Sequence, residues 1–159
     1  MITKKKVLTG IAGVLLVAAT AGYGAAAYYY SSHFYSHTEI NGTDYGEMTV
    51  AQVKKKIADQ IPSYQITIEE RNGQEETLTG EQLKLTYQDD GEIDKLMEDQ
   101  RPWAWVIHAF TGVHVQLENM VAVNEEALKQ AVEGLTCMQP GNMQAPKDAY
   151  VGITDDGYA

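Results

Sequence analysis

One long stretch without a charged side chain constrains this chain more than any other feature. It runs from Val7 to Tyr30, directly after Lys4, Lys5 and Lys6. At a rise of about 1.5 Å per residue, about 20 apolar residues cross a hydrocarbon core of about 30 Å. The tyrosines at 28–30 suit the headgroup region, where aromatic side chains are enriched. We therefore expect residues 7–30 to form a transmembrane helix.

The charges around this stretch predict its orientation. By the positive-inside rule, the lysine-rich tail at residues 1–6 stays in the cytoplasm and the rest of the chain is exported. A cleaved signal peptide is the alternative, because Ala25–Ala27 offers a small-residue cleavage site. The length of the apolar stretch and its terminal tyrosines favour an uncleaved anchor. We expect a single-pass protein of the cell membrane with an extracellular C-terminal domain.

Composition narrows the possible partners of the exported part. The chain carries 22 acidic and 12 basic side chains, and three of the bases precede the apolar stretch. The remaining 129 residues therefore have a net charge of −13 (22 acids against 9 bases). Such a surface repels phosphate backbones, so we expect no nucleic-acid partner.

A single cysteine, Cys137, limits the covalent and metal chemistry. It excludes an internal disulfide, CxxC redox chemistry and multi-cysteine zinc sites. We interpret Cys137 as a small, half-buried apolar residue.

Alternating apolar residues and helix caps predict an α+β domain over residues 37–143. A strand at Thr38–Ile40 precedes an Asn41-Gly42 turn. Thr49 can cap a helix that Pro62 ends. Residues 64–79 predict a hairpin around Asn72-Gly73, and residues 81–88 a further strand.

The second half of this domain continues the mixture. We expect helices at 92–100 after Asp90, at 102–112 beginning with Pro102, and at 125–135 after Asn124, with a strand at 113–123. The fold should be helices packed on a small, mostly antiparallel sheet. Residues 31–36 are predicted as a stalk. Residues 144–159 are predicted as a linker and an interrupted second unit, which indicates a fragment of a longer protein.

Aromatic side chains are the candidate binding residues. Trp103 and Trp105 lie on the predicted 102–112 helix. If exposed, they would offer a sugar-stacking platform or a docking surface, and if buried they would fill the core. Tyr64 and Tyr87 complete the set of candidate contacts. His108 on the same helix is expected to be a partly buried histidine with its hydrogen bonds satisfied.

Catalytic patterns are poorly represented. His33 and His37 have i, i+4 spacing but no acidic partner at zinc-site spacing. The chain contains no G-x-S-x-G and no phosphate-cradling glycine loop, and nothing close in sequence activates Cys137. The acids around Asp89 and Asp94 lack the spacing of a calcium loop. We therefore predict no enzymatic activity, no metal and no cofactor.

Two segments carry a resemblance to a known family. Thr38–Asp44 and Gly46–Val50, which leads into an amphipathic helix, resemble the peptidoglycan-binding domain that precedes YkuD-type L,D-transpeptidase domains in Gram-positive bacteria. A similar domain precedes VanW-type domains. The lysine leader, the anchor, the Arg101–Trp105 segment and the Ala145–Tyr150 linker fit that arrangement. Ala51 and Gln52 depart from it, because the family often has acidic residues there.

The resemblance implies an anchored accessory domain that binds peptidoglycan. The family's catalytic Ser-His-Gly-Cys block is absent, and Thr136-Cys137-Met138 does not match it. Any transpeptidase activity of the parent protein would therefore lie beyond residue 159. The open alternatives are a structural spacer or a protein-interaction module that positions a catalytic domain.

Overall fold

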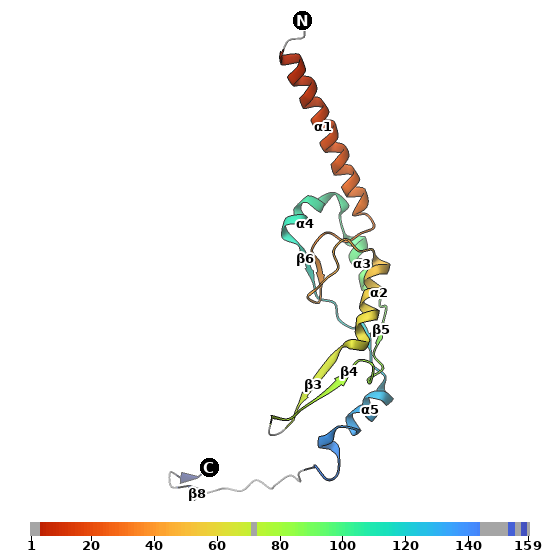
Figure 1. The fold of residues 1–159 in the computed structure, drawn as a ribbon, viewed down its shortest axis with the longest axis vertical. Coiled ribbons are helices and arrows are strands. Elements are labelled where there is room, and N and C mark those ends of the chain that lie inside the picture. Colours follow the sequence, from red (N-terminus) through yellow and green to blue (C-terminus); the bar gives the residue numbers. More distant parts are fainter. Residues whose placement is uncertain (1–3, 71–72, 144–152, 155–156, 159) are drawn as a thin grey trace.

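A computed structural model describes residues 4–70, 73–143, 153–154 and 157–158. Its first element, α1 (Lys4–Tyr29), is one continuous helix that projects from the rest of the molecule (Figure 1). Thr9–Tyr29 is long and apolar enough to cross a membrane, and none of its most apolar part is buried. A signal sequence near the N-terminus meets the same criteria, so length and composition leave both sequence interpretations standing.

The strands pair in small separate sheets. The largest has β1 (Thr38–Ile40) in the centre, antiparallel to β2 (Thr43–Asp44) and parallel to β6 (Val113–Val115). The hairpin of β3 (Gln65–Glu69) and β4 (Glu75–Thr79) is antiparallel, as is the pair β5 (Thr86–Tyr87) and β7 (Val121–Ala122). The predicted α+β class is confirmed, and β1–β6 adds one parallel pairing.

Local capping explains where the helices begin. α2 (Val50–Gln60) follows Thr49, whose side chain and that of Gln52 form a reciprocal capping box. The helix passes into the 3₁₀ turn η1 (Ile61–Ser63), which contains Pro62. Asn124 caps α5 (Glu125–Glu133) by accepting from the Ala127 amide at 2.8 Å. α3 (Glu92–Asp99) instead follows Gly91 at φ 83°, while Asp90 accepts from the Glu92 amide at 3.0 Å.

Two hydrophobic clusters hold these elements. The first joins β1, α2 and α3, and its buried members are Phe34, Ile40, Tyr45, Val53, Ile57, Ile61 and Ile93. The second lies under the β3–β4 hairpin and α5, around Leu78, Leu83 and Leu135. Figure 1 shows the elements arranged along an elongated molecule, with α4 (Trp105–Thr111) near α1 and the hairpin and α5 at the opposite end.

Three segments differ from the sequence expectations. The predicted strand at 81–88 is reduced to β5. Thr79 and Gln82 form a second capping box, and the Leu83 amide donates to the Thr79 carbonyl, so the chain there forms a helical turn instead of a strand. The predicted strand at 113–123 is divided into β6 and β7, which join different sheets. Phe34 and Tyr35, within the predicted stalk, are only 1% and 4% exposed.

The C-terminal segment contains a short strand pair. Within the residues predicted as an interrupted second unit, β8 (Ile153–Thr154) pairs antiparallel with β9 (Gly157–Tyr158). Of the predicted linker and second unit at 144–159, residues 144–152, 155–156 and 159 lie outside the described residues.

Candidate functional site

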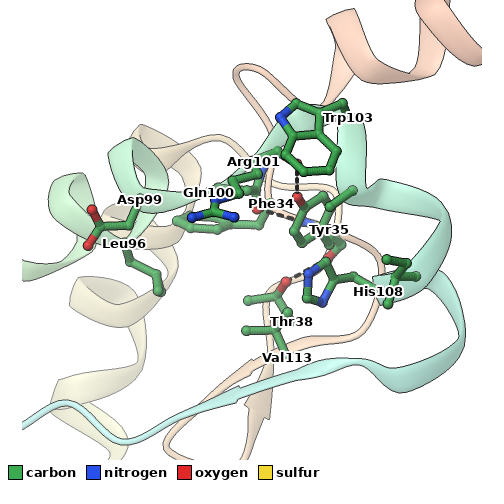
Figure 2. A pocket seen from close by; sticks show the side chains of 12 residues that line it. Phe34, Tyr35, Thr38, Leu96, Asp99, Gln100, Arg101, Trp103, His108 and Val113 are labelled. Atoms are coloured by element: carbon green, nitrogen blue, oxygen red, sulfur yellow. Dashed lines mark hydrogen bonds between the residues drawn. The ribbon is translucent and has the colours of Figure 1, made fainter.

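A pocket of about 380 Å³ opens at the end of the domain nearest α1. It lies between the segment after α1, the end of α3, the 3₁₀ turn η3 (Pro102–Ala104), α4 and β6. Apolar side chains make most of its wall, namely Phe34, Leu96, Ile107 and Val113. Asp99, Arg101, Trp103 and His108 also line it (Figure 2). The arrangement combines apolar walls with a few polar groups, as in many ligand sites.

Gln100 lines this pocket and binds the chain segment that follows α1. Its amide nitrogen donates to the carbonyl oxygens of Tyr30 at 2.6 Å and His33 at 2.8 Å. Its amide oxygen accepts from the Tyr35 backbone N–H at 3.2 Å. One side chain at the end of α3 therefore fixes the backbone that leaves α1, which local sequence gave no means to foresee.

Tyr35 and His108 form the inner side of the pocket. Their rings stack with centroids 4.5 Å apart, and the Tyr35 hydroxyl donates to the Arg101 carbonyl. Burial is the main cause that raises the pKa of Tyr35. His108 is half-buried, as predicted. Its Nδ1 atom, however, has no hydrogen-bond partner among the described residues, so the expectation of a satisfied histidine is wrong.

Trp105 joins the pocket region to α1. Its ring lies 6.1 Å from that of Tyr30 and 5.8 Å from that of Tyr23, centroid to centroid. The Tyr23 hydroxyl donates to the backbone carbonyl of Trp103. The two tryptophans therefore differ, because Trp105 is half-buried against α1 and Trp103 is 58% exposed at the pocket.

The other two predicted contact residues lie elsewhere. Tyr64 is exposed at the start of the β3–β4 hairpin. Tyr87 is half-buried on β5 against the first hydrophobic cluster, and its hydroxyl has no partner among the described residues. Neither lines the pocket. The four residues thus do not form one surface, and their role as contacts stays a prediction.

A separate group of polar side chains lies beside the hairpin. Single ligand atoms of Glu70, Glu76 and Cys137 all lie within 4.8 Å of one another. A hydrogen bond between the two carboxyls raises the pKa of Glu70 and lowers that of Glu76. Two carboxylates and a thiolate are ligands that a divalent zinc ion accepts.

The protonation of Cys137 bears on the chemistry of this group. Partial burial and the neighbouring Glu70 raise the pKa of the Cys137 thiol, so it stays protonated near neutral pH. A protonated thiol is a poor nucleophile and a poor ligand. The geometry is therefore that of two neighbouring carboxyl groups beside a half-buried thiol, and the half-buried position of Cys137 agrees with the expectation from the sequence.

Comparison with known family models, with curated proteins and with solved structures gave no match. The resemblance to the domain that precedes YkuD-type and VanW-type domains therefore stays a prediction.

Proposed function

We propose that this chain is a single-pass, membrane-anchored extracytoplasmic domain that holds its far end at a fixed position relative to the bilayer. The observation that carries the proposal is the junction between α1 and the domain. In the part of the chain that the structure describes, no flexible linker separates the two. Six residues after α1, the chain is already in the hydrophobic core, at buried Tyr35.

Aromatic and polar contacts fix this junction. The Tyr29 ring stacks on His33 with centroids 4.0 Å apart, and its hydroxyl donates to the Glu47 carbonyl at 3.3 Å. The Tyr30 and Ser36 hydroxyls are 2.8 Å apart. Together with Gln100 and Trp105, these contacts restrain the angle between α1 and the domain. A scaffold that sets position needs such a restrained joint.

A distance measurement across the joint tests this function. The full chain in lipid nanodiscs would carry nitroxide labels at Val17→Cys on α1 and Leu128→Cys on α5, in a Cys137→Ser background. Both positions are exposed. We expect a narrow distance distribution by pulsed electron paramagnetic resonance, and a broader one when Tyr30→Ala and Trp105→Ala are added.

The matched control is Tyr64→Ala, which removes an exposed aromatic ring away from the joint. It should leave the distribution narrow. A broad distribution in the unmodified junction would show a flexible tether and overturn the scaffold proposal.

A binding role is the second candidate, because an exposed tryptophan borders the pocket beside Arg101 and Asp99. Tryptophan faces stack on sugars, and the charged groups could contact peptide termini. A peptidoglycan fragment, the ligand that the sequence resemblance implies, has both parts. Calorimetric titration of the full chain in detergent with soluble peptidoglycan fragments tests it.

The two exposed aromatic residues make the binding test specific. If the pocket binds, Trp103→Ala should abolish the heat of binding and Tyr64→Ala should preserve it. Absence of heat with the unmodified chain would leave the scaffold role alone.

A further inference from the structure

An uncharged segment forms one side of the pocket on an otherwise acidic body. From Pro102 to Leu117 the chain has no Asp, Glu, Lys or Arg, although residues 31–159 together carry a net charge of −13. This segment supplies η3, α4 and β6. A continuous run without charged residues in an otherwise acidic domain indicates that this segment lies in an apolar environment.

The exposed side chains of this segment are large and apolar. Trp103 is 58% exposed, Ile107 is 61% exposed and Phe110 is 88% exposed. Spacings of four and three residues place them on one side of η3 and α4. We call these three residues the η3–α4 face. Soluble proteins seldom leave such a set of neighbouring apolar side chains uncovered.

The contact with α1 sets the level of this face. The Tyr23 hydroxyl on α1 donates a hydrogen bond to the Trp103 carbonyl. The turn η3 therefore lies against α1, near the end of that helix (Figure 1). Counted from Lys6, the last charge before the apolar stretch, the roughly 20 residues that cross a hydrocarbon core end near Ala26. Tyr23 precedes that point. If α1 spans a bilayer, Trp103 therefore lies at the boundary between acyl chains and headgroups, which is where tryptophan is enriched.

We propose that the η3–α4 face is inserted into the outer leaflet of the membrane that α1 crosses. The inference rests on the proposed function, since it needs α1 to be a membrane anchor. Lipid is the occupant because the face is continuous with a helix whose own surface is lipid-facing. Arg101, exposed and adjacent in sequence to η3, suits the level of the lipid phosphates. The insertion gives the domain a second attachment beside α1.

Depth measurements at three positions test this arrangement. Single cysteines at Phe110, Leu16 and Leu128 would be introduced separately into the full chain with Cys137→Ser and labelled with an environment-sensitive fluorophore. All three side chains are exposed, so substitution should not disturb the core. The chain would be placed in phosphatidylcholine vesicles that contain lipids with nitroxide quenchers either near the headgroup or near the end of the acyl chain.

We expect the label at Phe110 to lose fluorescence with the shallow quencher, the label at Leu16 with the deep quencher, and the label at Leu128 with neither. A Phe110 label that behaves like the Leu128 label, while Leu16 is quenched, overturns the insertion and leaves the anchor standing. A Phe110 label that is shielded from water but unquenched shows a protein partner and also overturns it. A water-exposed Leu16 label overturns the anchor and the insertion together.

Discussion

At the scale of single residues, Gln100 has the clearest structural task. Its side chain satisfies two carbonyls and one N–H of the segment between α1 and β1. These backbone groups have left α1 and do not yet belong to a sheet. A buried backbone group without a partner costs about 1–3 kcal/mol, so one amide side chain stabilises a whole turn of irregular chain.

Replacing Gln100 by leucine should therefore destabilise the domain. The variant keeps a similar volume but leaves three backbone groups unpaired, and we expect a loss of about 1–3 kcal/mol in the free energy of unfolding. Urea unfolding of the full chain in detergent, followed by circular dichroism, measures it. Gln88→Leu is the control, because Gln88 is exposed and precedes α3 in the sequence, whereas Gln100 follows it. Equal stability of the two variants would contradict the assigned role.

Lys54 on α2 links two acidic side chains of the α3 region. Its ammonium contacts Asp89 at 2.5 Å and also pairs with Asp94. The two hydrogen bonds raise the pKa of Lys54, and the Lys54 hydrogen bond lowers the pKa of Asp89. Both aspartates are about half exposed, so solvent screens the interaction and its value is modest.

Lys54→Met should lower the stability by about 1 kcal/mol at pH 7. Because the pKa of Asp89 is depressed in the folded state, its contribution is complete above the unfolded value of about 3.9 and is lost as the pH falls through the folded value. The difference between variant and parent should thus shrink below about pH 4. Urea unfolding at several pH values tests this.

The neighbouring lysine provides the control for this experiment. Lys55 pairs with Asp59 at 2.5 Å within α2, and both side chains are largely exposed. Lys55→Met should change the stability less than Lys54→Met at every pH. A pH-independent effect of Lys54→Met would mean that packing of its aliphatic stem, not its charge, stabilises the fold.

At the scale of elements, the fit between η1 and the turn after β4 depends on a glycine. The Gly80 amide donates to the Tyr64 carbonyl at 2.7 Å, and a Cβ at Gly80 would collide with the Ile61 carbonyl oxygen. The backbone fixes the position of a Cβ, and the atom that it meets is itself a backbone atom, so no side-chain rotation relieves the clash. The two hydrophobic clusters meet near this contact, through η1 on one side and Leu78 and Leu83 on the other.

Gly80→Ala should accordingly destabilise the domain by about 1–3 kcal/mol, the usual range for overpacking. Thermal unfolding of the full chain measures the change. Gly141→Ala is the matched control, because a Cβ there meets nothing within 4 Å. An unchanged melting temperature for Gly80→Ala would show that η1 and the hairpin can move apart without cost.

At the scale of the whole molecule, the charge distribution predicts which side of a membrane the domain would occupy. Lys4, Lys5 and Lys6 are the only charged residues before Tyr30. Basic residues beside a membrane span tend to be retained in the cytoplasm, so we expect the lysines to direct export of the acidic domain.

Changing the three lysines to glutamine should therefore reduce the fraction of chains with an exported domain. Protease added outside intact cells that express the full chain measures this fraction, with an epitope after Ala159 to follow cleavage. Lys54→Gln, Lys55→Gln and Lys56→Gln together form the control, since they remove equal charge far from the span. Unchanged export in the first variant would contradict the positive-inside assignment.

Local sequence predicted the elements that close on themselves. The Asn41-Gly42 turn, the Thr49 cap, the Asn124 cap and the hairpin follow from residues within a few positions of one another, and the structure contains each of them. The apolar stretch likewise gave α1. Short-range hydrogen bonds and steric preferences act within one segment, so they can be predicted from residues that are neighbours in the sequence.

Contacts between distant segments were decided by the tertiary structure alone. The parallel pairing of Thr38 with Val113, the Gln100 bonds to the end of α1, and the separation of Trp103 from Tyr64 and Tyr87 depend on which segments meet. The same holds for exposure, because the apolar spacing of Trp103, Ile107 and Phe110 fits a core-facing helix equally well. A periodic pattern shows that a helix has an apolar side, and only the surrounding fold determines whether protein or another medium covers it.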